Sequence, residues 1–171
     1  MKKIFLLAFT ILLSNFSEAQ IFAKKKANKD TKQWRYEVVC VDEGKGTNYT
    51  IKVFSFSKKP KVAIEQAKKN AVHAVIFQGV NAGPCVSQKP LVMNPNIEEE
   101  KKEFFKSFFA TGGKYMKFVT ASNNGRVRPE DVSKISKKEF KIGVIVSVDV
   151  DGLRRDLEAA GILQNLGNMF R

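Results

Sequence analysis

Few residues of this chain carry side chains suited to chemistry. The sequence holds one histidine, His73, and two cysteines, Cys40 and Cys85. A cysteine activated by an imidazole is a familiar nucleophile, but such a site needs a third group to orient the base, and no pattern supplies one. The acidic run Asp149 to Gly152 lacks the third acid and the terminal glutamate of a calcium loop. We therefore predict no catalytic, cofactor-binding or metal-binding residues, and we interpret His73 as a packing residue.

The cysteines have a second interpretation, as a disulfide. Cys40 lies in a predicted strand and Cys85 in a predicted loop, and an even number of cysteines in an exported chain favours pairing. A bridge would close a loop of about 45 residues and stabilise the fold by a few kcal/mol. The alternative is two buried thiols, because the sequence does not show whether the two Cα atoms lie close enough.

Residues 1–19 have the three parts of a secretory signal peptide. Lys2 and Lys3 form a positive start, and Ile4 to Leu13 is an apolar run. The triplet Ser17-Glu18-Ala19 places small residues where signal peptidase reads. We therefore predict cleavage after Ala19 and export to the periplasm or the exterior, with peripheral association at the outer membrane as one location. An uncleaved anchor is the alternative, but about ten apolar residues span a bilayer poorly.

The chain is strongly basic. It carries 30 Lys and Arg against 17 Asp and Glu, a net charge of +13, and loss of the signal peptide's Lys2, Lys3 and Glu18 leaves +12. Such a charge favours anionic partners: lipid head groups, lipopolysaccharide, acidic glycans or nucleic acid. Export argues against chromosomal nucleic acid. A lysine-rich surface that is only solvated is the alternative. No stretch after the signal peptide reaches transmembrane length.

Residues 20–32 are predicted to be a flexible basic arm. They contain five lysines and no periodicity. Three of these lysines, Lys24, Lys25 and Lys26, are candidate contacts for a partner, because each lysine near anionic lipid contributes about 1 kcal/mol. The alternative is a leader that only keeps the protein dissolved.

Residues 33–171 are predicted to form one α+β domain. Apolar residues recur at helical spacing from Val62 to Val80, and this stretch becomes apolar all round from Val72 onward, which indicates a buried central helix. Strand patterns precede it at Trp34 to Val41 and from Asn48 to about Phe56, joined by a hairpin turn. The clearest strand runs from Phe140 to Val150 with strict alternation.

The remaining segments complete the order ββααββα. A second helix is predicted from Ile97 to Ala110, a third strand from Lys114 to Ala121 and a short helical turn within Pro129 to Ser136. A closing helix, Gly152 to Ala160, is predicted to be capped by Asp151. The expected fold is an antiparallel sheet of about four strands packed against two to three helices.

Two segments have competing interpretations. The irregular stretch Asn81 to Asn96 is long for a compact domain, and such loops are often functional. Its triplet Leu91, Val92 and Met93 is a candidate partner-binding edge, unless the loop is only a crossover pinned by the disulfide. In the second helix, four phenylalanines between Phe104 and Phe109 share one face and form either an aromatic cleft or, more often, core.

One stretch also carries a resemblance. The helix sequence AIEQAKKNAVHAVIFQGV, residues 63–80, resembles the first helix of small α/β domains in bacterial surface lipoproteins and in periplasmic flagellar-assembly proteins. The signal peptide ending in Ala19-Gln20 resembles those of Bacteroidota, which implies a Gram-negative envelope. The chain departs from the lipoproteins because it has no lipid-attachment cysteine at the cleavage point. The resemblance implies an assembly or scaffold role rather than catalysis.

The sequence thus leaves three functional hypotheses. The first is an exported, non-catalytic binding or scaffold module whose partner is another envelope protein. The second is a binder of an anionic envelope ligand, either lipopolysaccharide, glycan or nucleic acid, through its basic surface. The third is a small hydrolase.

Overall fold

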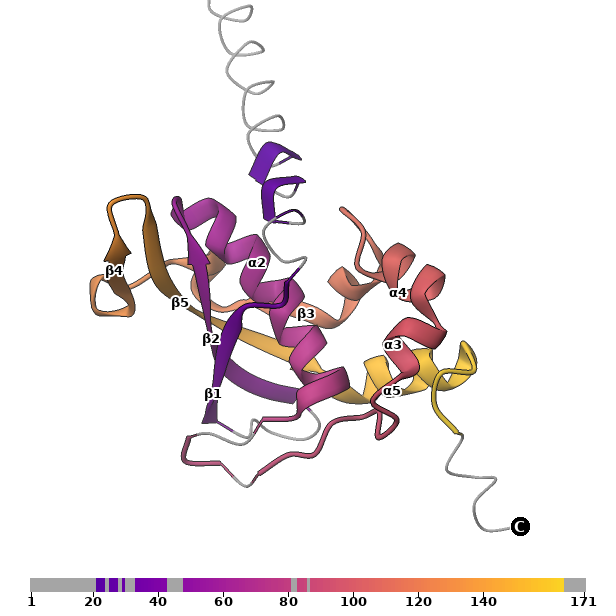
Figure 1. The fold of residues 1–171 in the computed structure, drawn as a ribbon. Coiled ribbons are helices and arrows are strands. Elements are labelled where there is room, and N and C mark those ends of the chain that lie inside the picture. Colours follow the sequence, from indigo (N-terminus) through magenta and orange to yellow (C-terminus); the bar gives the residue numbers. More distant parts are fainter. Residues whose placement is uncertain are drawn as a thin grey trace, which may run out of the picture.

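The computed structural model describes residues 21–23, 25–27, 29, 33–42, 48–80, 83–85 and 87–164. A curled antiparallel sheet packs against one long helix, and shorter helices lie beyond one end of the sheet (Figure 1). This arrangement confirms the predicted α+β class. The predicted signal peptide, the hairpin turn and the last seven residues fall outside the described ranges.

The sheet has five strands, all antiparallel. They are β1 (Tyr36–Asp42), β2 (Asn48–Ser57), β3 (Val119–Ala121), β4 (Val132–Ser136) and β5 (Glu139–Asp149). Strand β5 is central, as its alternating pattern predicted: it pairs with β2 on one edge, and with β3 and β4 at different points along the other. Strand β1 pairs with β2 and forms an outer edge.

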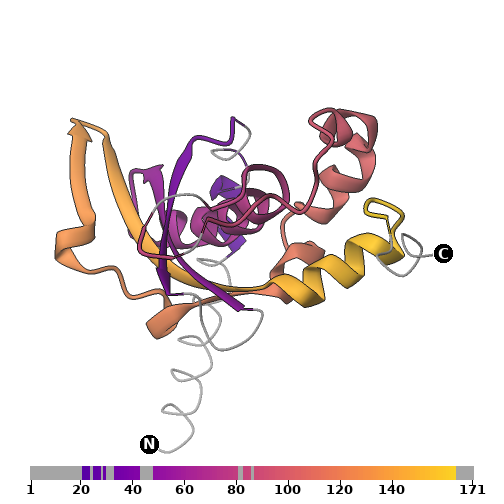
Figure 2. The same ribbon diagram turned by 90° about the horizontal axis from the view of Figure 1, so that it is seen from below.

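The helices connect these strands. They are α2 (Pro60–His73), which continues into the π-helical turn η1 (Ala74–Gln78), α3 (Ile97–Glu100), α4 (Lys102–Phe108) and α5 (Val150–Ala159). Short 3-10 turns follow at η2 (Lys114–Phe118), η3 (Ser122–Gly125) and η4 (Pro129–Asp131). Seen from below, the β4–β5 hairpin lies at the opposite end of the molecule from α3, α4 and α5 (Figure 2). None of the helices within the described ranges is long and apolar enough to cross a membrane.

Helix α2 meets the sheet through its smallest side chains. Ala63, Ala67 and Ala71 repeat every fourth residue and are completely buried, so the helix backbone can approach strands β2 and β5 closely. The sheet supplies buried β-branched residues such as Ile51 and Val146 to the same core. The prediction of a central helix from Val62 to Val80 is confirmed, with helical residues to Gln78, and its last third is buried on more than one side, apart from Phe77, which is half-buried, and Gln78, which is exposed.

The π-helical turn at the end of α2 anchors the long loop that follows it. Wider turns release backbone carbonyls from the helical ladder, and two of these accept hydrogen bonds from the loop. The amides of Leu91 and Val92 donate to the carbonyls of Val75 and Ile76 at 3.0 and 2.9 Å. Gly79 ends the turn with φ at 73°, and a Cβ there would lie 2.2 Å from the Gln88 carbonyl oxygen. Only glycine fits this close approach.

The structure differs from the prediction in two segments of the sheet. The segment predicted as a third strand, Lys114 to Ala121, is a 3-10 turn up to Phe118, and only its last three residues pair with β5. Tyr115 and Phe118 are buried three residues apart, which is the period of a 3-10 turn rather than of a strand. The helical turn predicted within Pro129 to Ser136 is present as η4, and the rest of that segment forms the strand β4, which was not predicted. All five residues of β4 are exposed, so no alternation marked it.

Two helix predictions also differ. Asp149 rather than Asp151 caps α5, because its Oδ1 accepts a hydrogen bond from the Gly152 amide at 2.9 Å. The predicted helix from Ile97 to Ala110 is interrupted at Lys101, whose φ of −112° leaves the helical range. The phenylalanines lie in and directly after the second half, α4, and supply core as the commoner interpretation expected, with Phe105, Phe108 and Phe109 buried and Phe104 half-buried.

The favoured disulfide is present. The sulfur atoms of Cys40 in β1 and Cys85 in the loop lie at bonding distance, with their Cα atoms 5.8 Å apart. The bridge links residues 45 positions apart, and the neighbouring Gly83 packs directly on the backbone of Cys40. The long loop is therefore held at both ends, by the bridge and by the hydrogen bonds to the π-helical turn.

We predict that loss of this bridge destabilises the fold. In the chain-entropy model, a closed loop of 45 residues contributes about 4 kcal/mol, and measured values commonly lie at about 2–4 kcal/mol. A variant with both Cys40→Ala and Cys85→Ala should lose that much free energy of unfolding in a urea titration. Reduction of the wild-type protein is the matched control and should give the same loss. An unchanged unfolding midpoint in both would contradict the prediction.

Candidate ligand-binding groove

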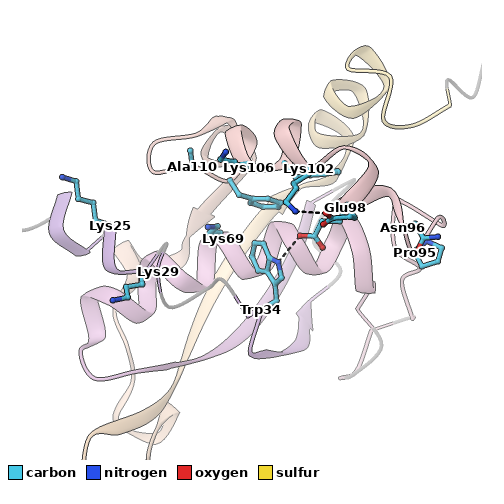
Figure 3. A pocket seen from close by; sticks show the side chains of 13 residues that line it. Lys25, Lys29, Trp34, Lys69, Pro95, Asn96, Glu98, Lys102, Lys106 and Ala110 are labelled. Atoms are coloured by element: carbon cyan, nitrogen blue, oxygen red, sulfur yellow. Dashed lines mark hydrogen bonds and ion pairs between the residues drawn. The ribbon is translucent and has the colours of Figure 1, made fainter.

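A groove of about 970 Å³ opens between α2 and the α3–α4 segment. Figure 3 shows Lys25 and Lys29 on one side, Lys102 and Lys106 on α4, and Lys69 and Trp34 between them. Its lining combines lysines with apolar rings and two carboxylates. The full lining is Lys25, Lys29, Trp34, Lys69, Pro95, Asn96, Glu98, Glu99, Lys102, Phe105, Lys106, Phe109 and Ala110.

The segment that precedes β1 forms one wall of the groove. Composition predicted a flexible arm at residues 20–32, yet residues 21–23 and 25–27 are helical. Ala23 and Ala27 lie one helical turn apart, are 8% and 2% exposed, and pack on Val62 at the start of α2. This small apolar cluster carries Lys25 and Lys29 to the edge of the groove.

Trp34 forms the floor and is held in a strained conformation. Its φ of 47° is the only positive value at a non-glycine position within the described residues. Such a conformation costs about 1–3 kcal/mol and persists only where surrounding contacts fix it. Here the indole stacks on the His73 ring at 3.6 Å between centroids, and its Nε1 donates a hydrogen bond to Glu98 Oε1 at 3.0 Å.

His73 joins strand β1, helix α2 and helix α3 beneath the groove. Burial lowers the pKa of His73 and raises the pKa of Tyr36, so the phenol keeps its proton and donates to the neutral imidazole. Tyr36 Oη lies 2.6 Å from His73 Nδ1. The protonated Nε2 then faces Glu98 Oε2 at 3.6 Å, too long for a direct hydrogen bond. Interaction with His73 lowers the pKa of Glu98.

Lys69 places a cation over the aromatic floor. The side chain is 7% exposed, and its Nζ lies 5.3 Å from the centre of the Trp34 ring and 5.9 Å from that of Phe109. Both distances are within the range of a cation–π interaction. Burial lowers the pKa of Lys69 to about 8, because removing an ammonium group from water disfavours its charged form.

The rim lysines differ in how they are held. Lys102 pairs with Glu99 at 2.7 Å, and Lys106 pairs with Glu103 at 3.4 Å. Neither Lys25 nor Lys29 forms an ion pair with any of the described residues. The groove therefore offers cations to a ligand along both sides and one at its floor.

The predicted contact residues fall in three different places. Lys25 lines the groove, Lys26 lines a second and smaller hollow, and Lys24 lies outside the described residues. Of the loop triplet, Val92 is buried in the core, Leu91 is half-buried and Met93 is 73% exposed. His73 is buried, in agreement with the packing interpretation.

Sequence reasoning did not identify Trp34, Lys69, Lys102 or Lys106 as groove residues. The pair Lys69 and His73 does lie one helical turn apart on α2, and Trp34 is the only tryptophan in the chain. These residues point to a common site only once the fold has brought the segment before β1 beside α2. No protein-family model, curated protein or solved structure matches this chain.

We predict that the burial of His73 makes stability depend on pH. Its pKa in the folded state is below the ordinary 6.5, so the unfolded chain binds more protons in the interval between the two values. Stability must therefore fall as pH decreases through about 6.5 toward the lowered value. Urea titrations between pH 7 and pH 5 should show this loss in the wild type.

The variant His73→Gln is the matched control, because an amide accepts a hydrogen bond from Tyr36 without titrating. Its stability should vary less over the same interval. Since His73 is the only histidine, its imidazole proton resonance can be followed directly by NMR. A midpoint at or above 6.5 would show that the ring is not held neutral.

Proposed function

We propose that this protein is exported to a bacterial envelope, acts there as a non-catalytic binding module, and holds an anionic ligand in the groove beside Trp34. The observation that carries the proposal is the placement of Lys69 over the rings of Trp34 and Phe109, with further lysines on both walls. Lipopolysaccharide and acidic glycans are the envelope ligands with matching charge.

The location of the cations supports binding rather than simple solvation. A lysine that only keeps a protein dissolved needs no burial, whereas Lys69 is almost wholly buried and still lines a groove. Burial of a cation is unfavourable unless a counter-charge or an aromatic ring compensates it. Trp34 and Phe109 supply such rings here, and a bound anion would add its charge beside the same cation.

The contacts of His73 also support a binding role. Its two ring nitrogens face Tyr36 and Glu98, and its ring face is covered by the indole of Trp34. In these positions the imidazole holds the Trp34 ring, which forms the floor of the groove, in place. Cys85, the other half of the hydrolase hypothesis, is bonded to Cys40.

A scaffold role with a protein partner is the second candidate, and Met93 favours it. This side chain is the most exposed of the large apolar ones within the described residues. It sits on a loop that the disulfide and the π-helical turn hold in place, so contact there would order little additional chain. A Met93→Glu variant that no longer co-purifies with an envelope protein would favour this candidate.

We predict that reversing a groove charge weakens anion binding. The unique Trp34 lies in the groove, so its fluorescence reports binding directly during titration with lipopolysaccharide or dextran sulfate. Replacement of Lys29 by Glu should weaken binding by about tenfold, because reversing a charge near an anion at a surface changes the Coulomb energy by about 1–2 kcal/mol.

The matched control is Lys134→Glu, which makes the same change on the exposed strand β4, away from the groove lining. It should bind almost as the wild type does. Equal losses in the two variants would mean that only the net charge matters. A Trp34 signal that no anion alters would rule out the groove as the site.

We also predict that binding depends on the charge of Lys69. The ammonium group attracts an anion below its pKa of about 8 and loses its charge above it. The affinity of the wild type should therefore fall as pH rises from 7 to 9. Lys69→Met should bind more weakly at pH 7 and lose this part of the pH dependence, while Lys69→Arg should keep its affinity, since a guanidinium stays charged. Identical pH profiles for the wild type and Lys69→Met would contradict the prediction.

A further inference from the structure

A second basic hollow lies next to the groove. It has a volume of about 460 Å³ and a lining dominated by cations, with one carboxylate. The lining is Lys26, Lys29, Gln33, Arg35, Phe56, Ser57, Lys58, Lys138 and Glu139. Lys29 also lines the groove, so the two hollows meet at this residue.

The cation of the second hollow is positioned in the same way as the cation of the groove. The Arg35 guanidinium lies 3.9 Å from the centre of the Phe56 ring and pairs with Glu139 at 3.2 Å. A planar guanidinium stacked on a ring loses little freedom when it binds an anion. Each hollow thus contains one cation held over an aromatic ring, Lys69 in the first and Arg35 in the second.

These cations and the His73 ring occupy the aromatic faces on which a nucleobase would have to stack. Proteins that hold single-stranded nucleic acid stack successive bases on exposed aromatic faces. Here His73 stacks on the indole of Trp34, Lys69 lies over the same ring system, and Arg35 lies over Phe56. The rings therefore serve to position cations, and the sites favour charge over base stacking.

We propose that the groove and the second hollow form one bipartite site, joined at Lys29, for a flexible linear polyanion whose phosphate or sulfate groups occupy both parts. The inference rests on the proposed function, since the groove is one half of the site. A small anion fills only one hollow, whereas a chain with repeated charges can contact the cations of both. The two contacts are then linked, and the second adds affinity without a separate binding event.

The test compares short and long anions by titration of Trp34 fluorescence. The probes are pyrophosphate, long-chain inorganic polyphosphate and dextran sulfate. The double variant Lys58→Glu with Lys138→Glu alters the second hollow only. It should bind pyrophosphate as the wild type does, and it should bind polyphosphate at least tenfold more weakly. The slope of log affinity against log salt for polyphosphate should also become shallower by roughly one to two, one for each lost phosphate contact.

The matched control replaces Lys117 and Lys134 by Glu, two exposed lysines that line neither hollow. This control should keep the affinity for polyphosphate. Tighter binding of polyphosphate than of dextran sulfate identifies phosphate as the preferred group, and the reverse identifies sulfate. Both results support a linear polyanion.

Three results would overturn the inference. Wild-type affinity for polyphosphate in the double variant would show that the second hollow takes no part, while the groove remains a site as long as Lys29→Glu still weakens binding. If Lys29→Glu and the double variant both bind polyphosphate as tightly as the wild type does, the proposed function itself is refuted. Tighter binding of oligothymidylate than of polyphosphate at matched charge would show that bases are recognised, which contradicts the ligand class.

Discussion

The close packing of α2 on the sheet determines where every other feature lies. Its alanine face allows the helix backbone to approach β2 and β5, so the opposite face places Lys69 in the lining of the groove and His73 beneath it. With a larger side chain at Ala67, the helix would stand further from the sheet, and the stack between Trp34 and His73 would separate. The 3.6 Å stack thus depends on a contact made on the other side of the helix.

Parts of the fold were predictable from the sequence, whereas the groove was not, because the groove is formed by residues that lie far apart in the chain. Strand β5 and the central helix follow from the periodicity of their apolar residues. Strand β4 escaped prediction because none of its side chains is buried, and the helical residues before Trp34 escaped because alanine spacing among lysines is a weak signal. The groove combines the segment before β1, the middle of α2 and the α3–α4 segment, and its lining residues lie up to 85 positions apart, between Lys25 and Ala110. No pattern within a short stretch of sequence shows that these residues lie close together in the fold.

The aromatic residues have a different role from the one that the sequence suggested. Four phenylalanines at helical spacing indicated core or an aromatic cleft, and Phe105 and Phe109 serve in both places, since they are buried and also line the groove. In the groove the contribution of Phe109 is electrostatic: the negative face of its ring stabilises the Lys69 cation, which burial would otherwise penalise. The basic composition by itself predicts only a preference for anions, whereas the fold places one cation over a ring in each of the two hollows, Lys69 and Arg35.

The disulfide also affects the behaviour of the protein toward other copies of itself. Strand β1 pairs with β2 alone among the described strands, and a strand with an open edge can recruit another chain into a continuous sheet. Cys85 and Gly83 bring the loop onto the backbone of Cys40 at one end of this edge, where the strand register is also irregular. The loop therefore covers this end of the edge, where another strand would otherwise have access to the backbone.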